Sequence, residues 1–207
     1  MNLQTSVDIL QSRDWKLVHQ SSICCVYNSA AQYLVTPLRS VGSMPAGTLD
    51  TLFRATYAPQ TASFKGQHSK KLSVPTVPVV LEKKGSQLWG RVELQKLLIL
   101  TCGASREMIT EKLHAQLNEL TTYLQAQNID RQILPNDYVF NFHHDLTAVR
   151  ELFQQFRINH LAEQTDIPQD LLSQFMSNKQ HPSTQEAQKI EMLIQQFGRE
   201  MLNFSLL

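Results

Sequence analysis

The chain has 207 residues, of which 42% are hydrophobic and 18% charged, and its formal net charge is +1. This length and composition predict a soluble globular protein with one large domain or two to three small ones. The net charge gives no argument for or against nucleic acid. Residues 1–73, however, carry seven Lys and Arg against three Asp and Glu, so the front of the chain is basic.

No apolar run approaches the length of a membrane span, and the N-terminus lacks the charged and then apolar pattern of a signal peptide. We therefore expect a cytoplasmic protein with no membrane partner. The three cysteines include the neighbours Cys24 and Cys25, and this count predicts neither a disulfide framework nor a metal site. No cofactor is expected either.

The first sixty residues predict the element order α-β-β-β-α. Apolar residues at helical spacing indicate a short helix at 3–13 and a second helix that begins at residues 44–48. Stretches rich in β-branched and aromatic residues predict three strands between them, at 15–20, 24–27 and 32–36.

Four pieces of this front region, residues 1–58, carry a family resemblance. They are Trp15-Lys16-Leu17-Val18-His19-Gln20, then Tyr27, the Val-Thr-Pro at 35–37, and above all the Met-Pro-Ala-Gly-Thr-Leu at 44–49. They resemble the HicA-type toxin, a small double-stranded-RNA-binding-like domain whose members are ribonucleases. The resemblance implies the same α+β domain for the front region.

The front region departs from that family at its catalytic position. In the family a Gly-Ser-His-His sequence precedes the second strand, and its first histidine is catalytic, whereas Cys24 stands at that place here. A thiol titrates about two pH units above imidazole and is a poor proton shuttle at neutral pH. We therefore expect no ribonuclease activity. His19, the nearby imidazole, is either a substitute for the lost group or an exposed strand histidine.

The basic charge of the front region leaves RNA binding without cleavage open. Lys16, Arg39 and Arg54 are the candidate phosphate contacts. The same surface could equally be solvated or could dock against an acidic partner. Residues 59–75 contain few large apolar side chains and are predicted to be a linker.

The middle region, residues 76–156, predicts a hairpin, a third strand and a long helix. The strands are expected at 77–82, 88–92 and 97–103, with a Gly-containing turn between the first two. Apolar residues at helical spacing predict an amphipathic helix at 108–124 after Ser105. A further strand is predicted at 138–142. Four apolar residues then mark a helix that leads into the C-terminal region: Val149, Leu152, Phe153 and Phe156.

Three segments of the middle region carry a second resemblance. They are the Glu-Lys-x-Gly-x-x-x-Trp-Gly-Arg-Val hairpin, the Thr-Cys-Gly-Ala-Ser-Arg-Glu turn, and the Tyr-x-Phe-x-Phe-x-x-Asp-Leu-Thr segment. They are similar to the βββα domain of HicB-type antitoxins, a partial ribonuclease-H-like fold that covers the toxin's active face. The carboxylates Asp137, Asp145 and Glu151 are isolated, so we interpret them as caps and surface charges.

The C-terminal region, residues 157–207, has the spacing of a helix-turn-helix. Ile158, Leu161 and Ala162 form one apolar helical face. A second apolar set, Leu171, Leu172 and Phe175, starts only after the break at Asp166-Ile167-Pro168. Pro168 suits a first helical turn, and Ser183-Thr184-Gln185-Glu186 reads as a capping box that opens a third helix.

The second of these short helices is the expected DNA-reading element. Its exposed positions can reach base edges in the major groove. The candidate DNA-binding residues are Gln169, Asp170, Ser173, Gln174 and Lys179. From residue 157 onward four Lys and Arg face six Asp and Glu, so one copy should bind DNA weakly and a dimer would be needed. A three-helix bundle that binds only protein is the alternative.

The C-terminal segments Leu-Ala-Glu-Gln-Thr-Asp-Ile-Pro, Leu-Leu-Ser-Gln-Phe and Lys-x-His-Pro-Ser resemble the phage-repressor-like helix-turn-helix that ends one class of HicB-type antitoxins. Together, the three resemblances imply a toxin and its antitoxin in one chain. We expect a dimeric, non-enzymatic, DNA-binding transcriptional regulator whose partners are operator DNA and itself. Two alternatives stay open: a self-inhibited ribonuclease that could bind RNA, and a protein-only neutraliser of a separate HicA-like toxin.

Overall fold

A computed structural model describes most of the chain. The described residues are 14–29, 32–38, 43–57, 75–94, 96–129, 138–147, 150 and 158–202. Three predicted features lie outside them: the helix at 3–13, the linker except for its last residue, and the four apolar residues of the helix expected after 148.

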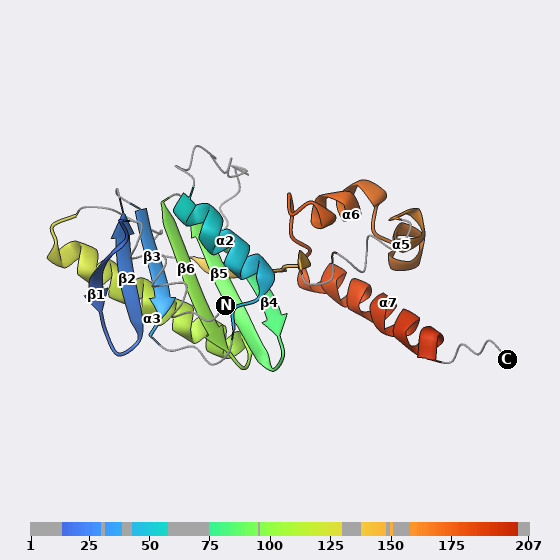
Figure 1. The fold of residues 1–207 in the computed structure, drawn as a ribbon, viewed down its shortest axis with the longest axis horizontal. Coiled ribbons are helices and arrows are strands. Elements are labelled where there is room, and N and C mark those ends of the chain that lie inside the picture. Colours follow the sequence, from blue (N-terminus) through green and yellow to red (C-terminus); the bar gives the residue numbers. More distant parts are fainter. Residues whose placement is uncertain are drawn as a thin grey trace. The chain divides into compact units, whose positions relative to one another are not determined.

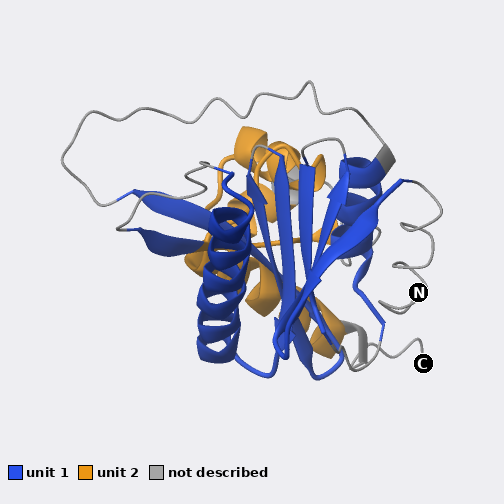
Figure 2. Ribbon diagram, turned by 90° about the vertical axis from the view of Figure 1, so that its left-hand side faces the viewer, with its two compact units in different colours: residues 1–141 blue, residues 142–207 orange. Residues whose placement is uncertain are grey.

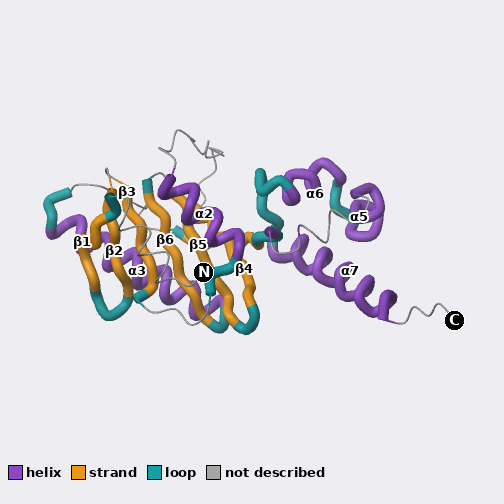
Figure 3. Tube along the Cα trace, viewed as in Figure 1, coloured by secondary structure: helices purple, strands orange, loops and turns teal. Residues whose placement is uncertain are grey.

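The fold is mixed α+β, as predicted, and its strands form one seven-stranded sheet (Figures 1 and 3). The strands are β1 (Lys16–Gln20), β2 (Cys24–Ser29), β3 (Gln32–Pro37), β4 (Thr76–Lys84), β5 (Gln87–Leu94), β6 (Leu97–Gly103) and β7 (Val139–His144). Their order in the sheet is β1-β2-β3-β6-β5-β4-β7. The described helices are α2 (Ala46–Tyr57), α3 (Arg106–Ala126), α5 (Ile158–Thr165), α6 (Gln169–Met176) and α7 (Thr184–Leu202).

The sheet joins the front and middle regions directly. Strands β3 and β6 pair in parallel, with Tyr33 opposite Leu97 and Val35 opposite Ile99. This pairing satisfies backbone groups that would otherwise lie along two open sheet edges. Residues 1–141 therefore form one compact unit, unit 1, where the sequence analysis expected two domains; residues 142–207 form unit 2 (Figure 2).

Helices α2 and α3 cover opposite faces of the sheet in unit 1 (Figure 1). Strand β6, which is central, is buried along its whole length, which explains its almost uniformly apolar sequence. On the α3 side, a Cβ at Gly90 would lie 2.6 Å from Ile109 Cγ2, so only glycine lets α3 approach β5 this closely. The predicted buried face of α3 is confirmed: Ile109, Leu113, Leu117, Leu120 and Leu124.

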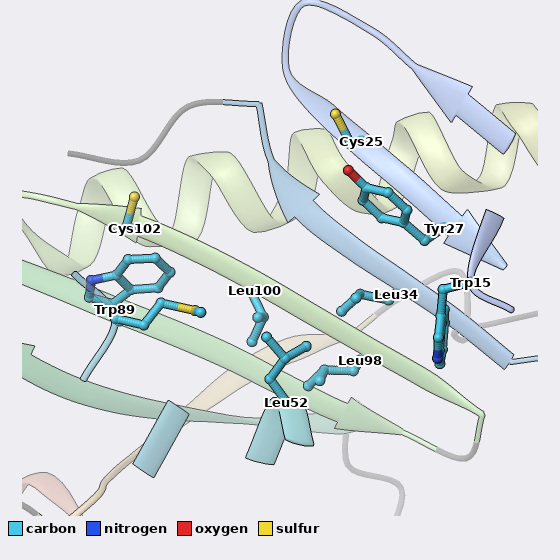
Figure 4. Close-up of a cluster of buried hydrophobic side chains, with 10 residues drawn as sticks. Trp15, Cys25, Tyr27, Leu34, Leu52, Trp89, Leu98, Leu100 and Cys102 are labelled. Atoms are coloured by element: carbon cyan, nitrogen blue, oxygen red, sulfur yellow. The ribbon is translucent and has the colours of Figure 1, made fainter. Parts of the chain in front are cut away.

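The core on the α2 side combines residues from the front and middle regions. Figure 4 shows Trp15, Leu34 and Leu52 from the front region beside Leu98, Leu100 and Trp89 from the middle region. Cys25 and Tyr27 of β2 and Cys102 of β6 complete this face. Because these side chains share one core, burial of apolar area stabilises the two regions together rather than separately.

Unit 2 consists of α5, α6 and α7 with the segment that precedes them. Its core is apolar and is drawn from every one of these elements: Leu146, Leu161, Ile167, Leu172, Phe175, Ile190 and Leu193. His144 N–H donates to the Pro182 carbonyl at 2.8 Å, which ties the entering strand to the start of α7. Within the described part of the chain, no helix is both long and apolar enough to cross a membrane.

Candidate nucleic-acid interface

Helix α5 ends at a turn whose backbone is set by Asp166. Asp166 has φ 53°, a left-handed conformation that stops a helix after its last turn. The preceding Thr165 is buried, and its hydroxyl donates to the Leu161 carbonyl at 2.7 Å. Pro168 then precedes α6 with φ −55°, and its carbonyl accepts the first helical hydrogen bond, from Leu172 N–H at 3.0 Å. The predicted break and the predicted start of the second helix are both confirmed.

Helix α6 divides sharply into a buried and an exposed face. Leu172 and Phe175 are buried and pack against residues of α5 and α7. Four of the five candidate DNA-binding residues lie on the opposite face and are exposed: Gln169, Asp170, Ser173 and Gln174. The structure therefore brings these four side chains together on one solvent-facing surface, which we name the α6 face.

Some polar groups of the α6 face, and the segment that follows it, are already engaged in hydrogen bonds to the backbone of α6. Ser173 Oγ donates to the Gln169 carbonyl at 2.9 Å, so this hydroxyl is already engaged. Lys179, the fifth candidate, is exposed beyond the end of α6, where its backbone N–H donates to the Gln174 carbonyl. The two glutamine amides thus have the chemistry best suited to read a base edge, since each carries a donor and an acceptor.

The predicted capping box at the start of α7 is also present. Ser183 N–H donates to Glu186 Oε2 at 2.8 Å, and Glu186 N–H donates to Ser183 Oγ at 3.4 Å. Between α6 and α7, Asn178 adopts φ 54°, and its side-chain amide donates to Thr147 Oγ1 at 3.1 Å. These contacts hold α6 between its neighbours in a defined orientation.

Cys24, which the sequence resemblance places where a HicA-type toxin has its catalytic histidine, is closed to solvent. Cys24 lies at the start of β2 and has 0% exposure. Burial raises the pKa of its thiol from 9.0 to about 11; the nearby Ser21 hydroxyl, 4.0 Å from Sγ, opposes that rise in pKa, and the charges of Glu119 and Cys25 add to it. A thiol with that pKa stays protonated at neutral pH and is not a nucleophile.

His19 is paired rather than free. Its Nε2 lies 3.0 Å from Glu119 Oε2 on α3, with side-chain exposures of 31% and 29%. The ring centre of Tyr123, also on α3, lies 5.6 Å from that of His19. The sequence analysis missed Glu119, because a strand and a helix a hundred residues apart give no local signal of contact.

The three candidate RNA-phosphate contacts do not form one group. Lys16 is exposed on β1, the edge strand of the sheet. Arg54 is on α2, where its guanidinium bonds to Asp50 Oδ2 at 3.1 Å and to Thr51 Oγ1 at 3.2 Å. Arg39 lies outside the described residues. The described side chains therefore give no clustered basic surface in the front region of the kind an RNA backbone needs.

A buried carboxylate among the described residues, that of Glu82, was not anticipated from the sequence. Glu82 on β4 accepts hydrogen bonds from Gly47 N–H at 2.9 Å and Thr48 N–H at 2.7 Å, and also from the Thr48 hydroxyl. The Glu82 carboxylate thus caps the N-terminus of α2, although Glu82 itself lies on strand β4. Arg91 Nη1 lies 3.7 Å from Glu82, and both side chains are 1% exposed. Arg91 Nε also donates to Glu93 at 3.1 Å.

The described carboxylates include no metal-binding group. Asp145 Oδ1 accepts a hydrogen bond from Thr147 N–H at 2.7 Å, so it acts as the local cap that we expected. Asp137 and Glu151 lie outside the described residues. Across the ranges that the structure covers, no group of three or more His, Cys, Asp or Glu could hold a metal ion.

Comparisons of the chain with protein-family models, with curated proteins and with solved structures find no match. Two places in the molecule therefore bear on its function. One is the open α6 face, and the other is the closed position of Cys24.

Proposed function

We propose that the protein is a DNA-binding transcriptional regulator of toxin–antitoxin origin, which acts as a dimer in the cytoplasm. In this proposal unit 2 holds a helix-turn-helix that reads operator DNA. The middle region is a HicB-like antitoxin domain, and the front region is a HicA-like domain that has lost its ribonuclease activity.

The observation that carries the proposal is the two-sided character of α6. Leu172 and Phe175 anchor the helix in the core, while the α6 face carries no apolar side chain. Eight residues make the helix about 12 Å long, and the major groove of B-DNA is about 12 Å wide. Glutamine can form a paired hydrogen bond with adenine there, so Gln169 and Gln174 are the residues we expect to select bases.

The closed position of Cys24 supports an inactive front region. Cleavage of RNA without a metal needs a group that exchanges a proton near neutral pH. The Cys24 thiol has a pKa of about 11 and no solvent access, so it cannot serve as that group. Helix α3 of the middle region packs on β2, the strand that carries Cys24.

The joint sheet supports a structural role for the front region. Two sets of contacts tie the front region to the middle region. They are the β3–β6 pairing and the hydrogen bonds that Glu82 accepts from N–H groups at the start of α2. A toxin-like domain held in this way is not a separate molecule that an antitoxin captures and releases. We expect it to act as a permanent part of the regulator.

One observation favours a second function, the binding of a partner protein through unit 2. From residue 157 onward six Asp and Glu outnumber four Lys and Arg. Lys189, one of those cations, lies 3.9 Å from Asp166 Oδ2 and so is partly engaged. Non-specific DNA affinity comes from the neutralisation of phosphates, which this charge balance opposes. A three-helix bundle that binds only protein, the alternative for this region, would meet no such opposition.

The self-inhibited ribonuclease has less support. It would have to use His19, since Cys24 is buried, and His19 Nε2 faces the Glu119 carboxylate. A carboxylate can orient a catalytic histidine, but the same bond also links β1 to α3.

A gel-shift titration at two salt concentrations tests the proposal. The probe is DNA from just upstream of the coding region, with a scrambled duplex of the same composition as competitor. The Gln169→Ala/Gln174→Ala variant should lose at least about tenfold in affinity for the selective site, since each paired contact with a base is worth about 1–3 kcal/mol. The matched control is Gln125→Ala/Gln127→Ala, the same change at exposed positions of unit 1, which should bind as the wild type does.

Selective binding that weakens with salt and disappears in the first variant only would support the regulator. Equal affinity of both variants for the upstream duplex would contradict it. A complete absence of selective binding would shift the argument to the protein-binding function.

A further inference from the structure

The segment that precedes α5 lies against the turn that follows α6. Leu146 belongs to the unit 2 core, which fixes this segment on the helices. The next residue, Thr147, is held by its backbone N–H, which donates to Asp145 Oδ1 at 2.7 Å. The Thr147 hydroxyl oxygen accepts hydrogen bonds from Asn178 Nδ2 at 3.1 Å and from Arg150 Nη2 at 3.5 Å. One oxygen atom therefore holds the guanidinium of Arg150 beside the side chain of Asn178.

A second cation lies at the same turn. Lys179 is the residue after Asn178 and is exposed, while Arg150 is partly exposed. The Lys179 backbone N–H donates to the Gln174 carbonyl at 3.0 Å, which anchors the residue to the last turn of α6. Two positive side chains thus flank Asn178, one held there through Thr147 and the other adjacent along the chain. We name Arg150, Asn178 and Lys179 the α6 end cluster.

The hydrogen bonding of α6 does not need these two cations. A cation near the end of a helix often serves its last carbonyl groups. Here the carbonyl groups of Ser173, Gln174 and Phe175 each accept a backbone N–H from residues 177–179. None of the ion pairs among the described residues includes Arg150 or Lys179. Both charges are therefore available to a ligand.

The α6 end cluster continues the surface that carries the α6 face. Gln174 is the last residue of that face, and its carbonyl is the acceptor for the Lys179 N–H. Helix α6 is about 12 Å long, and phosphates border a major groove that is about 12 Å wide. A helix of this length that presents Gln169 and Gln174 to base edges brings its end within reach of the backbone phosphates.

The surroundings of the cluster favour a phosphate backbone over an acidic protein. Protein interfaces are anchored by apolar and aromatic side chains. Among the described residues of unit 2, the one large hydrophobic side chain that is strongly exposed is Met192, eight residues into α7. The residues on either side of the cluster in the chain, Ser177 and Gln180, are polar and exposed. A guanidinium matches phosphate with two parallel hydrogen bonds, and an ammonium adds a point charge.

We propose that Arg150 and Lys179 bind phosphates of the DNA backbone beside the bases that the α6 face reads, with Thr147 holding the guanidinium in place. The inference deepens the proposed function and rests on it. Base contacts select a sequence, whereas phosphate contacts supply sequence-independent affinity and fix the register of the protein on the duplex. The local placement of two cations then provides affinity that the net charge of unit 2 does not.

Fluorescence anisotropy of the full-length protein with labelled DNA tests the proposal over a series of salt concentrations. The probes are the upstream duplex and a scrambled duplex of the same composition. Each phosphate contact contributes about 0.9 to the slope of log affinity against log salt. Arg150→Gln and Lys179→Gln should each lower that slope by about 0.9 for each protomer bound. At low salt each should weaken both duplexes equally, by about tenfold, since each removes a charged hydrogen bond.

Two further variants separate phosphate binding from net charge and from folding. Arg199→Gln removes the same charge from an exposed position in the last turn of α7, and the slope should stay at the wild-type value. Arg150→Lys keeps the charge beside Thr147, so it should keep the wild-type slope even if the guanidinium contributes to stability. Thermal unfolding followed by circular dichroism checks that each variant is folded.

An unchanged slope in both Arg150→Gln and Lys179→Gln would overturn the inference, and an equal fall in Arg199→Gln would do the same. A loss of affinity confined to the upstream duplex would also overturn it, because that result indicates base contacts. Poly-glutamate that competes as well as scrambled DNA of equal charge would identify an acidic protein as the partner and refute the phosphate assignment.

The same titrations distinguish this inference from the proposed function. Selective binding of the upstream duplex with unchanged slopes would refute the phosphate contacts alone. Equal binding of both duplexes, with slopes that fall in Arg150→Gln and Lys179→Gln, would support the phosphate contacts and refute the reading of sequence. If neither duplex binds, both are refuted.

Discussion

Two places that the sequence marks for function have opposite surroundings in the structure. The Cys24 side chain, which the sequence resemblance places where a HicA-type toxin has its catalytic histidine, is enclosed in unit 1, and burial raises the pKa of its thiol. Gln169 and Gln174 project from unit 2 into solvent on a helix whose other face is firmly packed. The buried Cys24 thiol cannot transfer a proton near neutral pH, whereas the exposed α6 face is accessible to a binding partner. Function is thus expected in unit 2, with unit 1 as its support.

The largest effect should come from removing the charge that joins the front and middle regions. Glu82→Ala leaves Arg91 and the N–H groups at the start of α2 without the buried carboxylate, at a cost of about 3–5 kcal/mol in unfolding free energy. Both tryptophans, Trp15 and Trp89, lie in unit 1, so the denaturant midpoint of tryptophan fluorescence reports on that unit.

The matched control for this change is Glu93→Gln, which alters the partly exposed partner of Arg91 and should cost much less. If the two variants shifted the fluorescence midpoint equally, the buried carboxylate would not hold the regions together. The β3–β6 pairing and the shared core would then be what joins the two regions.

A somewhat smaller effect is expected from the core beneath the α6 face. Leu172 is fully buried, and Leu172→Ala should lower the stability of unit 2 by about 2–5 kcal/mol. The variant's unit 2 should unfold at a lower temperature, seen as an earlier loss of the helical circular-dichroism signal. The midpoint of the tryptophan-fluorescence transition, which reports on unit 1, should not shift. Leu171→Ala, at the partly buried neighbour, should have a weaker effect. A concerted shift of both signals would contradict the independence of the two units.

The closed position of Cys24 predicts a dependence of stability on alkaline pH. The folded-state pKa of the thiol, about 11, lies above its ordinary value of 9.0. The unfolded chain therefore releases this proton first, and the thiol's contribution to stability falls as the pH rises from about 9 to about 11. Burial raises the pKa of Cys25 and Cys102 as well, so they add to the same decline.

Cys24→Ala should make that decline shallower, measured as unfolding free energy at pH 8, 9 and 10. A Ser29→Ala variant, changed in the same strand without loss of a thiol, is the control. If the native protein reacted rapidly with a thiol-modifying reagent at Cys24, the position would be open and the comparison between the two places would fail.

The smallest effect is expected at the link between β1 and α3. His19→Ala and Glu119→Gln each disrupt the partly exposed contact between His19 and Glu119 and should change stability by less than about 1 kcal/mol. Neither should alter RNA cleavage, because we expect none from the wild-type protein. Cleavage by the wild type that disappears in His19→Ala would support the self-inhibited ribonuclease.

Much of this fold could be predicted because its signals are local. Strand β6 was expected at its observed bounds, and the buried positions of α3 follow a clear helical period. The break at Asp166 and the capping box at Ser183 are also short-range patterns. The α6 face could be derived in the same way, since a helix that buries Leu172 and Phe175 turns Gln169, Asp170, Ser173 and Gln174 away from its core.

The parts that could not be predicted depend on contacts between distant residues. The sequence shows strands β3 and β6, but nothing in either indicates that they pair in parallel across sixty residues. Nothing in the sequence linked Glu82, at the end of a predicted strand, to Thr48, which lies 34 residues earlier at the start of α2. The partner of His19 was hidden for the same reason. These long-range contacts decide that the front and middle regions are one unit.

The most direct test of the central claim is a selection from random duplex DNA with the purified full-length protein, followed by sequencing of the bound pool. We expect enrichment of an inverted repeat, with two half-sites one helical turn apart or a multiple of it. This enrichment should disappear for Gln169→Ala/Gln174→Ala and persist for Gln125→Ala/Gln127→Ala. A pool that stays random with the wild-type protein, or the same repeat selected by both variants, would contradict the claim that α6 reads DNA.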